Sequence, residues 1–399
     1  MSHYLRGKKV LLCVSSGIAI YKTVDLASRL RKAGCILSII LTPQAREMVS
    51  DVVFSSVGGC AVYLDINDVK GGWIPHTELS QWADVVILAP ATANTMAKIA
   101  AGIADNLLLA TVLAATGKPK LLVPTMNSRM YENPATTRSI VQLRDYGWHI
   151  IDPETGELAC GEFGQGRYPD NEVIVSETEF ILTEKRLSGK KVLVTAGPTR
   201  ERIDRVRFIT NRSSGKMGYA VARAARNLGA TVVLVTGPTA LKPLHGIETV
   251  EVESAVEMKN AVAGRFSESD ILIMAAAVAD YSPENPSSEK IKKACGPIEL
   301  VLVRTSDILQ ELQGKEKRLV VGFCAEDQNL IENCRDKLIR KELDMIVAND
   351  ISSEDSGFES DHNDVWLLFK DGRKIHVPRM AKDEVAYRVV CEVANLQKS

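Results

Sequence analysis

The chain has 399 residues, 45% of them hydrophobic, and this length predicts two or three globular domains with sizeable cores. Its 49 basic and 50 acidic residues leave a net charge of -1, which argues against a general attraction to nucleic acid or to an anionic membrane. The eight cysteines are dispersed without a Cys-x-x-Cys pair and there are only six histidines, which argues against a zinc site or a disulfide framework.

The sequence shows no signal for export or for membrane insertion. The first nine residues are mostly polar, and the longest apolar run, residues 271–279, is far too short to span a bilayer. We therefore expect neither a signal peptide nor an anchor, and we expect a protein of the reducing cytoplasm.

In the first half, the pattern of apolar residues predicts a strand, a helix and a second strand. Residues 7–14 are typical of a buried strand, residues 18–33 of a helix closed by Gly34, and residues 35–41 of the next strand. Residues 176–179 have the spacing of a capping box, which predicts a helix over 177–186 at the end of this domain.

The strand–helix–strand pattern recurs in the second half, over residues 189–194, 219–228 and 230–235. We therefore predict an α/β protein with two doubly wound, Rossmann-like domains, residues 1–188 and 189–399, joined by a linker at 187–189. Near the carboxyl end, residues 365–370 and 373–377 flank Asp371-Gly372, which predicts an added β-hairpin with a two-residue turn, followed by a helix over 381–396.

Three polar loops follow predicted strands of the first domain. They are residues 16–17, residues 90–95 between a strand over 84–88 and a helix over 96–101, and residues 124–130 after a strand over 121–123. The carboxyl ends of parallel strands meet at one edge of a sheet, where helix starts bind phosphate. Each loop alone is a weak signal and none is Gly-x-Gly-x-x-Gly, but together they predict a flat, phosphorylated ligand.

Two further features of the first half allow a chemical or a plain structural interpretation. Residues 159–167 hold three glycines between Cys160 and Arg167, which predicts a mobile flap rather than a helix or strand interior. Cys160 could donate a proton from this flap, or it could be incidental to a glycine-rich turn. His76 stands at a predicted helix start, where a capping or surface role is the alternative.

The second half carries three features suited to an anionic nucleotide. Residues 211–218 enter a helix and could cradle an anion, although Met217 stands where a Walker A loop has Ser or Thr, and a glycine-rich linker is the alternative. A predicted strand over 271–279 ends at Asp280 and precedes the basic cluster 290–293. Lys337 and Lys341 share one side of a predicted helix, where they could reach phosphates or merely solvate a surface.

These motifs together resemble a known family over almost the whole chain: the bacterial bifunctional phosphopantothenoylcysteine decarboxylase / phosphopantothenate–cysteine ligases of coenzyme A synthesis. The first half is similar to flavin-containing cysteine decarboxylases through residues 16–19, 90–95, 124–130 and 159–167. The second half is similar to the ligase through residues 195–201, 211–218, 275–281, 290–293 and 321–323.

For the first half, the resemblance implies a flavodoxin-like, FMN-binding sheet. FMN oxidises the thiol end of the substrate to a thioaldehyde, so that the neighbouring carboxylate can leave as carbon dioxide. The resemblance makes Cys160 the proton donor and His76 a base or orienting group, and it lets Asn127 hold the substrate carboxylate or amide. The implied FMN contacts are Ser16, Gly17, Thr42, Thr92, Asn94, Thr95 and Met126.

For the second half, the resemblance implies that CTP activates 4'-phosphopantothenate as an acyl-cytidylate, which the amine of cysteine then attacks. Several negative charges meet in this step, so Mg²⁺ and lysines are required. Lys290 is the implied main charge stabiliser, and Asn211 the residue that binds the acyl-cytidylate. The other implied nucleotide contacts are Ala275, Ala276, Asp280, Ser306, Asp307, Ile308, Leu309, Phe323, Lys337 and Lys341, whereas no metal ligands are assigned.

The sequence departs from the family pattern at Thr92, at Tyr131 and at residues 304–307, and the last departure bears on the nucleotide contacts. A regulatory, non-catalytic flavoprotein is one alternative, which the presence of both His76 and Cys160 disfavours. A cysteine decarboxylase acting on a peptide would leave the ligase half unexplained, and a two-domain nucleotide-binding oxidoreductase would predict a Gly-x-Gly-x-x-Gly motif, which is absent. The family also implies small-molecule substrates, no nucleic acid or membrane partner, and a homo-oligomer of trimeric decarboxylase units linked by ligase dimers into a dodecamer.

Overall fold

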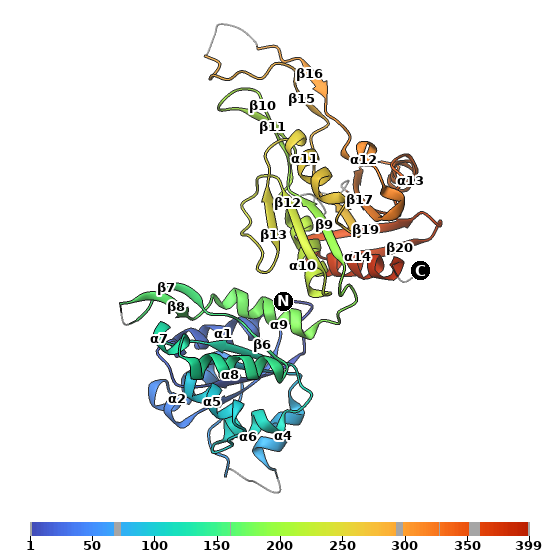
Figure 1. The fold of residues 1–399 in the computed structure, drawn as a ribbon. Coiled ribbons are helices and arrows are strands. Elements are labelled where there is room, and N and C mark those ends of the chain that lie inside the picture. Colours follow the sequence, from blue (N-terminus) through green and yellow to red (C-terminus); the bar gives the residue numbers. More distant parts are fainter. Residues whose placement is uncertain are drawn as a thin grey trace. The chain divides into compact units, whose positions relative to one another are not determined.

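The computed structural model describes residues 2–67, 73–159, 161–292, 298–326, 328–350 and 360–397. The chain divides into two compact units, Met1–Thr183 and Glu184–Ser399, each with its own sheet (Figure 1). Within the described ranges, no helix has both the length and the apolar character that a membrane span requires.

A parallel sheet of six strands forms the centre of the first unit, in the order β3-β2-β1-β4-β5-β6. The strands are β1 (Lys9–Val14), β2 (Ile36–Leu41), β3 (Val62–Tyr63), β4 (Val85–Ala91), β5 (Lys120–Pro124) and β6 (Trp148–Ile150). The central strands are continuous apolar runs that are buried on both faces, as parallel strands require. The predicted doubly wound α/β arrangement is therefore confirmed for this half.

Helices cover both faces of this sheet. Helices α4 (Pro75–Trp82), α5 (Ala93–Ala100), α6 (Leu107–Ala114) and α8 (Pro134–Asp145) form a core with one face. Helices α1 (Ile20–Lys32), α3 (Asp51–Gly58) and α9 (Asn171–Leu182) contact the strands from the other face. Two short helices, α2 (Pro43–Met48) and α7 (Ser128–Tyr131), follow β2 and β5.

The helix predicted over 177–186 was wrong in its bounds, since α9 begins at Asn171 and ends at Leu182. Asp170 caps this helix, with its carboxylate accepting from the backbone N–H of Glu172. The residues of the supposed capping box lie inside the helix, where Thr178 is fully buried and donates to the carbonyl of Ile174. A capping-box pattern is local, and here an earlier acidic cap decides the start.

The expectation that the glycines of residues 159–167 exclude a strand was also wrong. Strand β8 (Phe163–Arg167) pairs antiparallel with β7 (Glu154–Glu157), and Gly164 and Gly166 lie inside it. A Cβ on Gly166, whose φ is 147°, would lie 2.1 Å from the carbonyl oxygen of Met126. Glycine is thus required because this β7–β8 hairpin lies directly against the loop after β5.

The second unit has an eight-stranded sheet in the order β13-β12-β9-β14-β17-β18-β19-β20. Its parallel strands are β9 (Lys191–Ala196), β12 (Thr231–Thr236), β13 (Glu248–Glu251), β14 (Ile271–Met274), β17 (Leu319–Glu326) and β18 (Met345–Asp350). Strands β19 (His362–Phe369) and β20 (Lys374–Ala381) add antiparallel to β18, so the predicted hairpin is present. The N–H of Phe369 donates to the carbonyl of Arg373 at 3.0 Å, so Lys370 belongs to the connection together with Asp371 and Gly372, and the turn is longer than the predicted two residues. Gly372 adopts a φ of 91° in this turn.

Helices again cover both faces. Helices α10 (Lys216–Asn227) and α14 (Lys382–Leu396) pack together on one face, and α11 (Ala255–Phe266), α12 (Ile308–Glu311) and α13 (Leu330–Arg340) pack on the other, with a 3-10 turn at Lys315–Lys317. Two small antiparallel pairs, β10 (Arg200–Arg202) with β11 (Phe208–Thr210) and β15 (Tyr281–Pro283) with β16 (Leu302–Arg304), lie near each other beyond one end of the sheet (Figure 1).

The strand predicted over 271–279 ends at Met274. Beyond it, the backbone N–H groups of Ala276 and Ala279 donate to the hydroxyls of Thr195 and Thr199, at 3.1 and 2.9 Å. These side-chain acceptors replace the ladder of the sheet, so residues 275–279 form a loop at the end of β14.

Candidate functional sites

In the first unit, the three predicted loops do converge. They follow β1, β4 and β5, which are neighbours in the sheet and end at the same edge. The buried hydroxyl of Ser15 donates to the carbonyl of Pro90 at 2.7 Å and accepts from the N–H of Thr92 at 3.1 Å. Ser15 thus joins the first two loops, a contact that sequence reasoning missed because its partners lie 75 and 77 residues away.

Hydroxyl-bearing helix caps surround this edge. Thr42 caps α2 through the N–H of Ala45 at 3.2 Å, and Thr92 caps α5 through the N–H of Thr95 at 3.3 Å. Asn94 is exposed in the first turn of α5, whereas Ser16 and Gly17 are half-buried at the end of β1. Free N–H groups at such helix starts and small residues between them suit a phosphate and a flat ring system.

The loop after β5 is tied to the β7–β8 hairpin. Met126 N–H donates to the carbonyl of Gly166 at 3.1 Å. The amide of Asn127 donates to one carboxylate oxygen of Glu162 at 2.9 Å, and the guanidinium of Arg129 lies 2.8 Å from the other oxygen. Cys160, the predicted proton donor, lies outside the described residues.

His76 lies in the first turn of α4, as predicted, but it does not cap the helix, because the N-cap is Ile74. It is half-buried, and its Nδ1 is buried without a hydrogen-bond partner in the part of the chain that the structure describes. A buried imidazole nitrogen without a partner is costly unless a ligand or another chain supplies one. This observation disfavours the plain capping interpretation.

In the second unit, a cavity of about 410 Å³ lies at the carboxyl ends of β14 and β17. The loop 211–218, which opens α10, forms one wall of it. Six predicted site residues line this cavity: Asn211, Ala275, Ala276, Asp280, Phe323 and Lys337. The amide of Asn211 donates to the carbonyls of Ala277 and Val278, at 3.1 Å each, and so fixes the loop that follows β14.

Lys337 is paired inside this cavity. Its ammonium donates to Glu326 at 2.6 Å and lies 3.4 Å from the thiol of Cys324. Burial acts to lower the pKa of Lys337, but Glu326 and Cys324 together hold this pKa above its ordinary value. The lysine therefore stays cationic, as a triphosphate contact requires.

The other predicted nucleotide contacts lie outside the residues that line the cavity. Lys341 pairs with Asp307 at 3.0 Å, and Asp307 also caps α12, so that Ile308 and Leu309 are buried in its first turn. The hydroxyl of Ser306 accepts from Lys259 at 3.1 Å.

Lys290 is exposed on the segment between β15 and β16, and the last residue of the basic cluster, Lys293, is outside the described residues. The N–H of the next residue, Ile291, donates to the buried carboxylate of Asp204 at 3.1 Å. The structure therefore anchors the segment of Lys290 to the β10–β11 connection and not to the cavity wall.

Lys216, which belongs to the predicted loop 211–218, also lines the cavity. Three further polar lining residues were missed by sequence reasoning: Asn349, Asn363 and Lys382. Burial, with a contribution from Lys216, lowers the pKa of Lys382. No motif marks these three residues, because they come from separate strands and helices. Within the described ranges, no group of three or more His, Cys, Asp or Glu could hold a metal ion.

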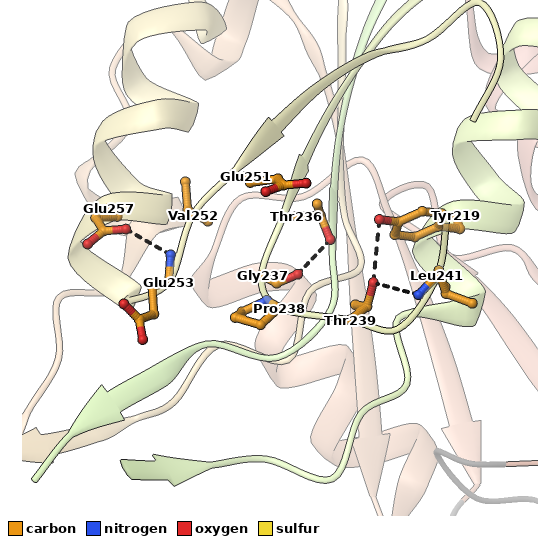
Figure 2. Close-up of a pocket in the computed structure, with 10 residues that line it drawn as sticks. All are labelled: Tyr219, Thr236, Gly237, Pro238, Thr239, Leu241, Glu251, Val252, Glu253 and Glu257. Atoms are coloured by element: carbon orange, nitrogen blue, oxygen red, sulfur yellow. Dashed lines mark hydrogen bonds between the residues drawn. The ribbon is translucent and has the colours of Figure 1, made fainter. Parts of the chain in front are cut away.

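A second cavity in this unit, of about 440 Å³, lies at the carboxyl ends of β12 and β13 (Figure 2). Figure 2 shows the hydroxyl of Thr239 hydrogen-bonded to Tyr219 and to the backbone N–H of Leu241, two glutamates on the other side of the view, and a third glutamate between the two sides. Those glutamates are Glu251, Glu253 and Glu257. None of the predicted site residues lines this cavity, and its carboxylates would repel a triphosphate.

Comparison with known proteins agrees with the division of the chain into two units. Residues 1–182 match the family model described as Flavoprotein, and residues 187–396 match that of the DNA/pantothenate metabolism flavoprotein C-terminal domain. The coenzyme A biosynthesis bifunctional protein CoaBC of Bacillus subtilis (strain 168) is 46% identical over 400 residues, which cover 99% of this chain and 98% of the relative.

The protein of the same description from Vibrio cholerae serotype O1 is 41% identical over 391 residues, 97% of this chain and 98% of the relative. A crystal structure of the C-terminal domain of a CoaBC protein is 44% identical, covers 54% of this chain and 99% of that chain, and has a TM-score of 0.47. The chain therefore belongs to the family of coenzyme A biosynthesis bifunctional proteins.

Proposed function

We propose that this chain catalyses two consecutive steps of coenzyme A synthesis. Residues 189–399 ligate 4'-phosphopantothenate with cysteine by way of an acyl-cytidylate formed from CTP. Residues 1–188 then decarboxylate the 4'-phosphopantothenoylcysteine to 4'-phosphopantetheine with FMN. The observation that carries this proposal is the 46% identity with a bifunctional relative over 99% of the chain. The division of the chain into two compact units supports one step for each unit.

The carboxyl edge of the first sheet fits FMN. The hydroxyls of Thr42 and Thr92 cap helices at this edge, and helix starts favour a phosphate. Gly17, which has no side chain, is a further proposed contact. Further proposed contacts are Ser16, Asn94, Thr95 and Met126. Bound FMN supplies the electron sink for the oxidation that precedes loss of carbon dioxide.

Three side chains of the first unit have proposed roles in this step. Asn127 donates its amide to the carboxylate of the substrate, since it already holds a carboxylate in this structure. His76 offers a buried nitrogen without a described partner, suited to orienting or deprotonating the substrate. Cys160 returns a proton to the decarboxylated intermediate.

For the ligation we propose that the cavity of the second unit binds the cytidine nucleotide. Lys337 stays charged beside Glu326 and contacts the triphosphate, and Asn211 and the loop 211–218 enclose the acyl-cytidylate. Lys290 stabilises the charge that develops on the phosphates, and Lys341 and residues 306–309 complete the nucleotide contacts. Mg²⁺ would accompany the triphosphate and offset part of its negative charge.

The test is mass spectrometry of purified protein incubated with 4'-phosphopantothenate, cysteine, CTP and Mg²⁺, after an absorption spectrum for bound flavin. We expect 4'-phosphopantetheine and CMP to accumulate, and replacement of CTP by ATP to slow the ligation. If flavin is bound but no product forms with either nucleotide, a regulatory flavoprotein becomes the better interpretation.

We further propose a cytoplasmic homo-oligomer in which decarboxylase trimers are linked by ligase dimers into a dodecamer. The unpartnered nitrogen of His76 supports a subunit contact, since a neighbouring chain could complete its surroundings. Light scattering coupled to size-exclusion chromatography would give the subunit number directly.

A further inference from the structure

The carboxylate of Glu162 contacts Asn127, the residue proposed to bind the substrate carboxylate. Asn127 Nδ2 donates to Glu162 Oε2 at 2.9 Å, and Arg129 Nη2 lies 2.8 Å from Glu162 Oε1. Each oxygen thus has its own donor, one neutral and one cationic. This is the arrangement by which proteins bind a carboxylate ligand.

The orientation of the Asn127 amide follows from its neighbours. Asn127 is the N-cap of α7, and its Oδ1 accepts from the backbone N–H of Arg129 at 2.9 Å. Because the oxygen is engaged by an N–H, the NH₂ group must face Glu162 and can only donate there. The Asn127–Arg129 pair is therefore built to receive an acceptor.

Glu162 lies in the connection between β7 and β8, whereas Asn127 and Arg129 belong to the loop and short helix after β5. The hairpin is held on that loop by Met126 N–H and by the close approach of Gly164 to Ser128. The side chains of Arg129 and Glu162 are 83% and 38% exposed, so a dissolved carboxylate has access to the same donors.

We propose that Glu162 competes with the substrate carboxylate for the amide of Asn127, and that Arg129 is a second donor to that carboxylate. This inference rests on the proposed function. The substrate carboxylate competes with Glu162 for the two donors, so Arg129 contributes to substrate selection beyond Asn127. When that carboxylate leaves as carbon dioxide, the donors become available to Glu162 again, which favours release of the product.

Two unreactive ligands separate this competition from a purely structural contact. One is 4'-phosphopantothenoylserine, which keeps the carboxylate but has a hydroxyl in place of the thiol. The other is its decarboxylated counterpart, 4'-phosphopantothenoylethanolamine. Their binding to the full-length, flavin-loaded protein is measured by isothermal titration calorimetry.

We expect Glu162→Ala to tighten binding of the serine ligand about tenfold, because an internal competitor is removed. Arg129→Leu should weaken it by about tenfold, since a charge-assisted contact is lost. Neither variant should change the affinity for the ethanolamine ligand. Glu157→Ala on β7 and Arg138→Leu on α8, both exposed residues, serve as matched controls and should change neither affinity.

If Glu162 only fastens the hairpin, both ligands change in parallel in Glu162→Ala, and the inference fails. It also fails if neither variant changes either affinity. If the wild-type protein forms no 4'-phosphopantetheine and binds neither ligand, the proposed function itself fails. Product formation by the wild type without the selective effect overturns only the competition by Glu162.

Discussion

Lys337, which lines the proposed nucleotide cavity, forms a half-buried ion pair with Glu326. The two side chains are 37% and 19% exposed, and Asn333 donates to the second oxygen of Glu326 at 3.4 Å. Burial acts to raise the pKa of Glu326, but Lys337 and Cys324 bring it below its ordinary value of 4.5. The pair therefore contributes most where both groups are charged.

The substitution Glu326→Gln should lower the free energy of unfolding by about 0.5–1 kcal/mol near pH 7, a small amount because solvent screens the pair. The native pKa of Glu326 is lowered, so its contribution is complete above the ordinary value of 4.5 and is lost as the pH falls through the lowered value. The pKa of Lys337 is raised, so the contribution of its charge to stability is complete below the ordinary value of 10.5 and is lost only as the pH rises through the raised value.

Urea denaturation at pH values between 3 and 9 measures this difference. Wild type and Glu326→Gln should converge at the acid end. Glu316→Gln, an exposed glutamate just before β17, is the control and should match wild type throughout. A constant difference that does not shrink in acid would mean that Gln disturbs packing rather than charge.

The β7–β8 hairpin is an element whose position depends on one glycine. Gly166 has a φ of 147°, and a Cβ there would lie 2.1 Å from the carbonyl oxygen of Met126. Gly166→Ala should therefore displace the hairpin from the loop after β5, at a cost of about 2 kcal/mol or more. Faster proteolytic cleavage between residues 154 and 167 would detect this displacement.

Gly264→Ala is the matched control, since Gly264 lies inside α11 and a Cβ there meets nothing within 4 Å. That change should leave cleavage of the hairpin unaltered and should slightly stabilise α11. Equal cleavage rates for Gly166→Ala and wild type would show that the loop after β5 moves to relieve the clash and that the hairpin keeps its position.

The carboxylate of Asp204 holds the segment that carries Lys290. The carboxylate of Asp204 accepts from the N–H groups of Val206, Arg207 and Ile291, at 2.7, 2.8 and 3.1 Å. The backbone hydrogen bond from Val206 is the largest of several contacts that lower the pKa of Asp204. The anchor is therefore present above the ordinary value of 3.8 and is lost as the pH falls through the lowered one.

Asp204→Asn replaces one acceptor oxygen with an NH₂ group and should release the segment of Lys290. We expect the rate of pyrophosphate release to fall at least about tenfold, because the lysine is no longer positioned. Decarboxylation of added 4'-phosphopantothenoylcysteine should be unchanged. Asp371→Asn, which removes a similar turn contact in the β19–β20 connection, is the control; equal losses in both variants would argue against a positioning role.

The sequence predicted the elements whose signal is local. The apolar runs of β1, β9 and β12 and the convergence of loops after β1, β4 and β5 follow from strand periodicity and parallel topology. Two of the errors occurred where a distant partner decides the outcome: Thr195 and Thr199 end β14 early, and the loop after β5 requires the glycines of β8. The bounds of α9 were wrong for a local reason, because Asp170 caps the helix before the supposed capping box.

The same holds for the candidate sites. The family resemblance pointed to Asn127, Asn211 and Lys337, but not to the carboxylates that pair with two of them, although Glu162 lies inside the quoted motif 159–167. Glu162 and Glu326 have no sequence signal that connects them to their partners, which lie 35 and 11 residues away.

At the scale of the whole molecule, the junction of the two units determines which fragments are stable. The structure divides between Thr183 and Glu184, whereas the sequence suggested a linker at residues 187–189. Leu187 is 1% exposed within the core of the second unit, and its N–H donates to the carbonyl of Leu228 at 2.8 Å. Lys185 donates to the carbonyl of Asn227 at 3.0 Å.

A fragment of residues 184–399 should therefore unfold cooperatively and should be more stable than a fragment of residues 189–399, by about 2–4 kcal/mol for the lost leucine and its neighbours. Guanidinium denaturation of the two fragments measures this difference. Leu187→Ala in the longer fragment isolates the side chain and should account for most of it. Equal midpoints would mean that the core of the second unit closes without Leu187, and that residues 184–188 act only as a connection.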